Sequence, residues 1–180
     1  MSRYRRAKTT GSSYFFTVVA YRRQPIMCSD SIRNALRTAI EKVRVARPFE
    51  IDAWVLLPDH LHCVWTLPEG DADFSNRWMK IKRSVSLACG DEFRRDEWMT
   101  ASKSRHREST IWQRRFWEHQ IRDENDFASH VDYIHHNPVK HGHVQHAADW
   151  PYSTFHRYVR DGVYVRDWAG AMDGVELEYD

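Results

Sequence analysis

Two apolar stretches separated by only two residues constrain the fold of this chain most. Residues 51–57 (IDAWVLL) and 60–67 (HLHCVWTL) lie on either side of Pro58-Asp59. A two-residue link can join antiparallel strands but is too short for the crossover that parallel strands need. The sequence therefore predicts a β-hairpin with strands over residues 49–57 and 60–67.

The second of these strands begins with two histidines around one leucine. Side chains on a strand alternate between faces, so His60 and His62 point the same way with Cβ atoms roughly 7 Å apart, while Leu61 points into a core. Two imidazoles on one face can share a divalent metal ion. The alternative is a half-exposed polar strand face, because the chain has 11 histidines in 180 residues and a chance pair is not rare.

An amphipathic helix is predicted over residues 124–137. Phe127, Val131 and Ile134 have the i, i+4, i+7 spacing of a buried stripe. Asp123 or Asn125 could cap its start, and we expect it to end before Pro138, because the residue before a proline avoids helical angles.

Tyr133 and Asn137 lie off that stripe, on a face that we expect to be polar. They are i and i+4 and so project from the same side of the helix, together with Asp126, Ser129 and His130. A tyrosine hydroxyl beside a carboxamide could serve as a nucleophile beside a third metal ligand. The alternative is a tyrosine whose ring is packed and whose hydroxyl faces water.

The order of all predicted strands and helices along the chain indicates the fold. A strand is predicted over residues 14–20, helices over 29–45 and 74–89, and a further strand within 110–120. The order β-α-β-β-α-β followed by a helix predicts an α+β fold, a ferredoxin-like (RRM-like) antiparallel sheet covered by helices. Residues 91–109 are polar and charged, and we expect a long loop or insertion there.

Length and composition indicate one folded domain over residues 1–180, with a basic N-terminal arm over 1–12 and a C-terminal tail from about 159. The three cysteines are widely spaced and form no CxxC pair, which favours reduced thiols rather than a zinc knuckle or a disulfide framework. No apolar run reaches 18 residues, so we expect no membrane span and, with reduced thiols, a cytoplasmic protein.

Net charge is only +2, so the overall balance does not by itself indicate a nucleic-acid partner. The basic residues are nevertheless clustered, and several clusters lie beside aromatic residues, which suits a phosphate backbone with stacked bases. An ordinary solvated surface is the alternative for each cluster. The candidate DNA-binding residues are Arg3, Arg5, Arg6, Lys8, Lys82, Arg83, Arg114 and Arg115.

These motifs resemble those of the REP-associated tyrosine transposases, which belong to the HUH single-tyrosine transposase superfamily. The matching segments are WVLLPDHLHCVWTLPEG (54–70), IWQRRFWEHQIRDENDF (111–127), HVDYIHHNPVKHG (130–142) and DWPYSTFHRY (149–158). The resemblance implies that His60 and His62 are metal ligands on a central strand, that Asn137 supplies a third ligand, and that Tyr133, on a C-terminal helix, is the catalytic tyrosine.

By the same resemblance, the chain would cut and rejoin single-stranded DNA at hairpin-forming REP-like repeats through a 5′-phosphotyrosine intermediate. A site of two imidazoles and an amide oxygen suits Mg²⁺ or Mn²⁺. The protein would act as a monomer or a homodimer. Two alternatives remain open: a non-catalytic DNA-binding regulator that keeps the fold, and a zinc hydrolase unrelated to DNA.

Overall fold

The computed structural model of the chain describes residues 11–170 and contains a four-stranded sheet. All strand pairs are antiparallel and the order is β2-β3-β1-β4, so β3 is an interior strand. The predicted α+β fold is confirmed. The strands are β1 (Ser13–Val19), β2 (Glu50–Leu56), β3 (His60–Thr66) and β4 (Trp117–Gln120).

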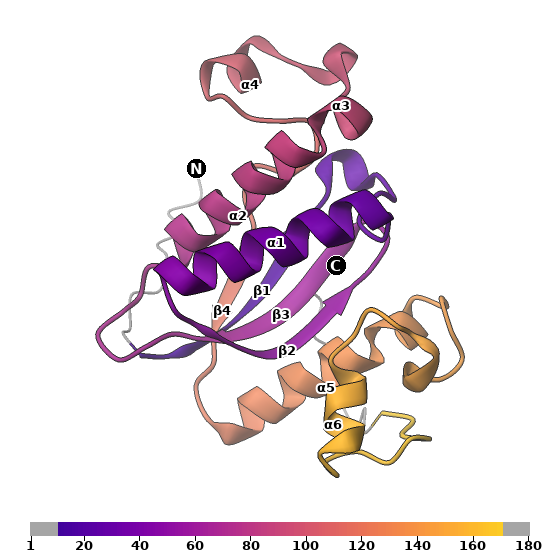
Figure 1. Ribbon diagram of the computed structural model, residues 1–180. Helices are drawn as coiled ribbons and strands as arrows, with labels where there is room; N and C mark the ends of the chain where they lie inside the picture. The colour runs from indigo at the N-terminus through magenta and orange to yellow at the C-terminus, as the bar shows by residue number, and fades with distance from the viewer. Residues whose placement is uncertain (1–10, 171–180) are drawn as a thin grey trace, which may run out of the picture.

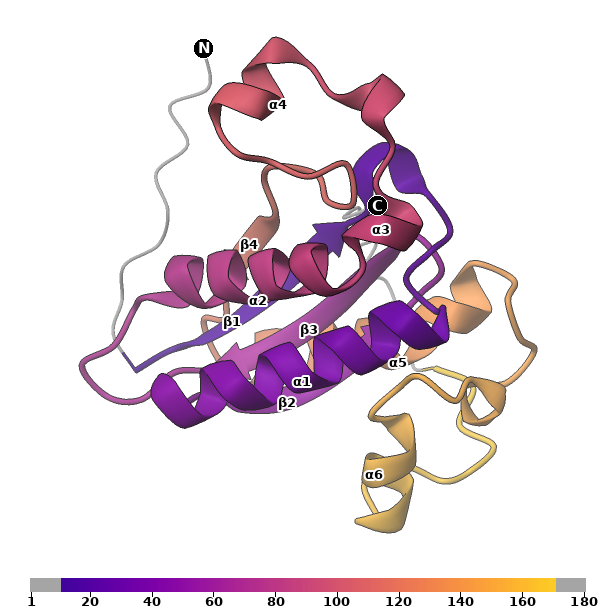
Figure 2. The same cartoon turned by 45° about the horizontal axis from the view of Figure 1, so that its top comes forward.

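Helices cover both faces of the sheet (Figures 1 and 2). Helices α1 (Asp30–Ala46) and α2 (Phe74–Ala88) lie on one face, and α5 (Glu124–Lys140) lies on the other. Each begins at a side-chain cap: Ser29, Asp73 and Asp123 accept hydrogen bonds from backbone N–H groups three residues ahead.

Strand alternation produces two cores. Odd-numbered β3 residues from Leu61 to Trp65 face α1 and α2, where the Trp65 ring stacks on Trp78 at 4.2 Å between centroids. Even-numbered residues face α5, where Val64 packs beside Phe15, Val131 and Ile134. His60 and His62 share the second face by the same alternation, as the sequence predicted.

The segment that we expected to be a long loop, residues 91–109, contains short helices. These are α3 (Gly90–Phe93), the 3₁₀ turn η2 (Asp96–Trp98) and α4 (Ala101–Arg105). Phe93 is buried, and Lys103 lies 3.8 Å from the ring centroid of Tyr21 while its Nζ donates to the Ser109 carbonyl. The polar composition did not reveal these buried contacts, because the sequence alone does not distinguish a lysine with a buried aliphatic stem from a fully solvated lysine.

The prediction that the last long helix ends before Pro138 was wrong, because α5 continues through Pro138 to Lys140. Proline removes one N–H donor, and near a helix end that is a single lost bond. The backbone bonds from His141 to the Asn137 carbonyl and from His143 to the Pro138 carbonyl continue the turn.

Residues beyond α5 pack beside that helix and along the outer edge of β2, where Ser153 bridges to Val55. They include η3 (Ala147–Asp149) and α6 (Phe155–Arg160), with His135 of α5 packed against Phe155 and Tyr158. The remaining element is the 3₁₀ turn η1 (Tyr21–Arg23) after β1. Among residues 11–170, no helix has the length and apolar character needed to cross a bilayer.

Candidate active site

His60 and His62 form a buried pair on the face of β3 that α5 covers. Their side chains are 2% and 0% exposed, and their ring centroids are 4.8 Å apart. The two Nε2 atoms face each other at 3.1 Å. The strand alternation predicted from the sequence therefore brings both imidazoles to one point.

Neighbouring groups fix the orientation of the His60 ring. Its Nδ1 lies 2.6 Å from Asp59 Oδ1, and because a carboxylate only accepts, Nδ1 carries the proton and Nε2 presents a lone pair in the neutral ring. Arg23 Nη1 donates to the other Asp59 oxygen at 3.0 Å. Burial raises the pKa of Asp59, but the hydrogen bonds and charges of His60 and Arg23 outweigh it and lower the pKa to about 2.

The His62 ring is oriented from the neighbouring strand. Its Nδ1 lies 2.9 Å from the hydroxyl oxygen of Thr17, which pairs directly with His62 across β1 and β3. Sequence analysis missed Thr17, Asp59 and Arg23. Asp59 could have been found from its place next to His60, whereas Thr17 is 45 residues away in sequence and only the strand register identifies it.

The residues present fit a divalent metal. Two ligand atoms in neighbouring coordination positions, each about 2.1 Å from an ion, stand roughly 3 Å apart, as the two Nε2 atoms do. On α5, both Asn137 side-chain polar atoms are buried and have no hydrogen-bond partner among the described residues. A buried amide without a partner is costly, and coordination through its oxygen would remove part of that cost.

Tyr133 lies beside His62, with the two rings edge-to-face. Its ring centroid is 5.2 Å from that of His62 and 6.0 Å from that of Phe15, and the residue is 2% exposed. Tyr133 lies off the apolar stripe of α5, as the sequence predicted, and it is nevertheless buried, because α5 buries a wider arc than that stripe. The predicted polar face is the one that lies against the sheet beside the histidines.

Two basic side chains at the end of α5 flank this site. Lys140 Nζ lies 5.0 Å from the ring centroid of Tyr133, and the His141 ring lies 5.4 Å from the His60 ring. The sequence analysis did not identify His141 as a site residue. The sequence signal for His141 was its position just after the helix that carries Tyr133. Only the extension of that helix past Pro138 brings His141 beside His60.

The candidate DNA-binding residues divide into three groups. Arg3, Arg5, Arg6 and Lys8 lie outside the described residues. Arg83 and Arg115 are exposed. Lys82 Nζ donates to the carbonyl oxygens of Gln113 and Arg114, and Arg114 pairs with Glu108 at 3.0 Å, so these two cations also hold the chain together.

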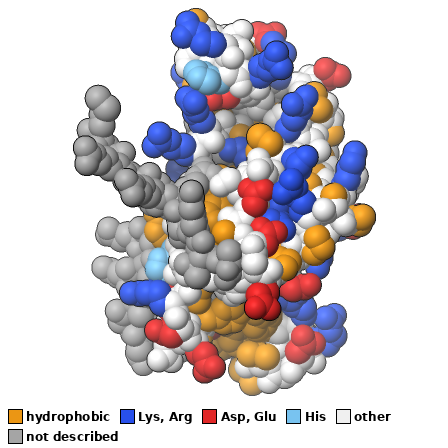
Figure 3. Space-filling view, turned by 90° about the vertical axis from the view of Figure 1, so that its left-hand side faces the viewer, with side chains coloured by type: hydrophobic (Ala, Val, Ile, Leu, Met, Phe, Trp, Pro, Cys, Tyr) orange, Lys and Arg blue, Asp and Glu red, His pale blue; other side chains and the backbone are white. Residues whose placement is uncertain are grey.

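A cleft of about 830 Å³ lies between α2 and residues 106–116. Basic side chains line much of it: Lys82, Arg83, Arg94, Arg107 and Arg114. Figure 3 shows Lys and Arg side chains gathered over the upper half of the molecule, toward the end that carries α3 and α4. The fold thus concentrates positive charge beside the start of β4.

Comparison with known proteins agrees with this arrangement. The family model described as transposase IS200-like matches residues 8–137. The REP-associated tyrosine transposase of Escherichia coli (strain K12) is 50% identical over 170 residues, covering 94% of this chain and 92% of the relative. A Haemophilus influenzae protein named for the same group is 44% identical over 173 residues, covering 96% of each chain.

A solved structure agrees as well. The REP-associated tyrosine transposase bound to a REP hairpin matches this chain with a TM-score of 0.81 and 48% identity, covering 98% of this chain and 96% of the other. The resemblance inferred from the sequence motifs is confirmed. This chain belongs to the IS200-like transposase family and, within it, to the REP-associated tyrosine transposases.

Proposed function

We propose that this transposase cuts and rejoins single-stranded DNA at hairpin-forming REP-like repeats, with Tyr133 as nucleophile. The observation that carries the proposal is the buried His60–His62 pair, with facing Nε2 atoms and with the Tyr133 ring packed edge-to-face on His62. His60, His62 and Asn137 would hold Mg²⁺ or Mn²⁺, which when bound neutralises charge on the phosphate oxygens.

The chemistry conserves a phosphodiester bond. The Tyr133 oxygen bonds to the scissile phosphorus as the bond to the 3′ oxygen of the preceding nucleotide breaks. The phenolic proton passes to solvent, and the leaving 3′ oxygen gains a proton. The result is a 5′-phosphotyrosine link and a free 3′ hydroxyl, and attack by a 3′ hydroxyl on that link restores the DNA without ATP.

The protein residues around the pair orient these groups. Asp59 and Thr17 fix the two imidazole planes, and packing against Phe15 holds the tyrosine ring. Lys140, whose Nζ lies 5.0 Å from the Tyr133 ring centroid, would offset the negative charge that develops on the tyrosine as its proton leaves.

Hairpin DNA is the substrate that we assign to the basic surfaces. The solved relative is bound to a REP hairpin, and the cleft beside α2 offers exposed arginines for phosphate contacts. The N-terminal residues Arg3, Arg5, Arg6 and Lys8 would add contacts near the foot of the hairpin. We propose that residues 1–180 act as one domain at the nucleoid, as a monomer or a homodimer.

A covalent-capture gel tests the proposal. Incubating the protein with a labelled hairpin oligonucleotide and Mn²⁺ should give a protein–DNA band that survives denaturation. Tyr133→Phe should abolish that band while leaving binding nearly intact, and His60→Ala or His62→Ala should abolish the metal-dependent band. Binding without any covalent product from the wild type would instead favour a non-catalytic regulator that keeps the fold.

A further inference from the structure

Three nearly parallel rings run from the surface of β4 to α5. The rings of Trp117 and His119 lie 6.0 Å apart with planes 2° from parallel, and those of His119 and His130 lie 4.7 Å apart at 14°. His130 in turn packs on Phe15, whose ring stacks on His62. The outermost member, Trp117, is 38% exposed.

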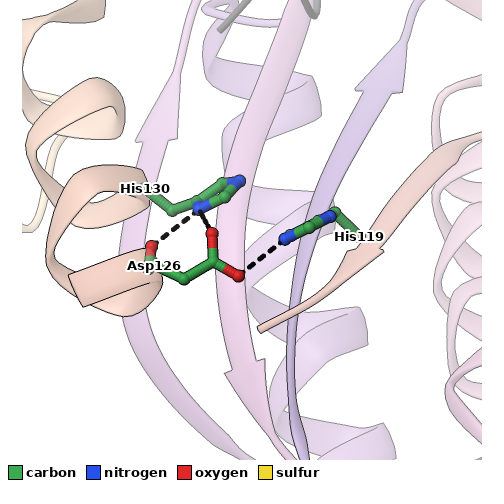
Figure 4. A group of neighbouring side chains, drawn as sticks. All are labelled: His119, Asp126 and His130. Atoms are coloured by element: carbon green, nitrogen blue, oxygen red, sulfur yellow. Dashed lines mark hydrogen bonds and ion pairs between the residues drawn. The ribbon is translucent and has the colours of Figure 1, made fainter. Parts of the chain in front are cut away.

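The Asp126 carboxylate holds the inner rings in place (Figure 4). It accepts from His119 Nε2 at 2.8 Å and from the backbone N–H of Arg122 at 2.9 Å, and it lies 3.1 Å from His130 Nδ1. Burial raises the pKa of Asp126, but the hydrogen bonds from His119 and Arg122 outweigh it and lower the pKa to about 2. The carboxylate therefore stays ionised near neutral pH and fixes the His119 plane.

His119, Asp126 and His130 also have the composition of a metal site, since they offer three ligand atoms within 4.8 Å of one another. Their geometry favours ring stacking instead. His130 Nδ1 donates to the Asp126 backbone carbonyl at 2.7 Å, so that nitrogen carries a proton. A metal must lie near the plane of each imidazole that binds it, and two stacked, nearly parallel rings do not share such a point.

The stack is aligned with the candidate active site. Thr17 pairs with His62 on one side and with Trp117 on the other, so the three residues form one row across β3, β1 and β4. At a strand spacing of about 4.8 Å, the Trp117 backbone is about 10 Å from that of His62. Trp117 and His119 lie on the same face of the sheet as His62. They are two residues apart on β4, so their side chains point the same way. Trp117 packs on Phe15, and His119 packs on His130, which itself contacts Phe15.

Trp117 also lies where DNA would pass between two surfaces. Phe116, the residue before Trp117, lines the basic cleft, and β4 is the edge strand of the sheet. A single DNA strand whose phosphates bind in the cleft would turn around this edge of the sheet to reach the histidine pair. An exposed indole supported by parallel rings is the kind of platform on which a single-stranded base stacks.

We propose that Trp117 is the stacking platform for the nucleobase next to the scissile phosphate. The proposal rests on the proposed function and adds a specific contact to it. The His119–Asp126–His130 group keeps the platform rigid, so the base is positioned and not merely attracted. Because every base has a stacking face, this contact would set the path of the strand more than its sequence.

A double-mutant cycle between protein and DNA tests the platform. The cleavage position is first mapped by covalent capture with the wild type. Affinities are then measured in EDTA for wild type, Trp117→Ala and Trp117→Phe, with oligonucleotides that are intact or abasic beside the scissile phosphate. The adjacent base is also replaced by 2-aminopurine, whose fluorescence is quenched by stacking.

We expect Trp117→Ala to weaken binding of intact DNA by between about 5-fold and 150-fold, the range for loss of one stacked base. Removing the base should cost the wild type a similar factor but cost Trp117→Ala almost nothing. The 2-aminopurine should be quenched by wild type and by Trp117→Phe, and not by Trp117→Ala. Thermal unfolding should show that both variants remain folded, because Trp117 lies on the edge strand and belongs to neither of the two buried cores.

Additive losses for the protein and DNA changes, or equal quenching by Trp117→Ala, would rule the platform out. If the wild type still forms the covalent product in that case, only the platform is wrong. If the wild type neither binds nor captures the hairpin, the proposed function fails, and the platform fails with it.

Discussion

Replacing Asp59 by asparagine isolates the electrostatic support of the histidine pair. The carboxylate accepts from His60 Nδ1 at 2.6 Å and carries its charge because its pKa is lowered to about 2. Asparagine is nearly the same size and can still present an oxygen to His60. The change therefore removes the negative charge and leaves the packing in place.

The expected loss of metal affinity follows from this one contact. A hydrogen bond to a charged group contributes about 1.5–3 kcal/mol, which corresponds to roughly 10-fold to 150-fold in a binding constant. Outer partners of metal-binding histidines typically affect affinity by about 10-fold to 100-fold. Because the asparagine oxygen retains a neutral hydrogen bond, we expect Asp59→Asn to weaken Mn²⁺ binding by about 10-fold.

Calorimetric titration of the DNA-free protein with Mn²⁺ measures this loss directly. Asp30→Asn is a matched control, since that carboxylate pairs with Arg33 on α1 and its side chain is 84% exposed. Arg23→Ala removes the other partner of Asp59, an exposed ion pair, and should change affinity by less than about 5-fold. An Asp59→Asn affinity within 2-fold of wild type would refute this account of how His60 is held.

Three further changes test the packing and the charges. Thr17→Val should leave His62 Nδ1 without its 2.9 Å partner and lower the free energy of unfolding by about 1–3 kcal/mol, and Thr17→Ser should recover most of it in urea titrations. Trp78→Ala removes a buried ring stacked on Trp65 and should cost about 3–5 kcal/mol by the same assay; a loss below about 1 kcal/mol would contradict the core described above. Because the pKa of Asp126 is lowered from 3.8 to about 2, its contribution to stability is complete above about pH 4 and is lost as the pH falls toward 2. Asp126→Asn should therefore flatten the decline of Tm across that range, and an unchanged slope would rule out the ionised carboxylate as a source of stability.

Local sequence patterns predicted most of the fold. The two-residue link at Pro58-Asp59 required an antiparallel hairpin, and strand alternation alone placed His60 and His62 on one face. The helices over α1, α2 and α5 followed from apolar spacing and polar caps. Such features depend on residues close together in sequence, where backbone geometry fixes the direction of each side chain.

Contacts between distant segments could not be predicted in this way. Three contacts depend on which elements pack together: the pairing of Thr17 with His62, the packing of Tyr133 on His62, and the carbonyl partners of Lys82. Packing also carried α5 through Pro138, because the burial of Asn137 and Pro138 offsets the loss of a single hydrogen bond near the helix end.

The sequence by itself thus determined the four strands and the three long helices, apart from the end of α5, and the motif resemblance named the residues of the candidate site. The tertiary structure decided their surroundings: which carboxylate and hydroxyl orient the imidazoles, and which rings stack beside them. The physical reason is that periodicity is a property of one segment, whereas a hydrogen bond or ring stack across the sheet depends on register and docking. Trp117 illustrates this division, because only the pairing of β4 with β1 places it in line with His62.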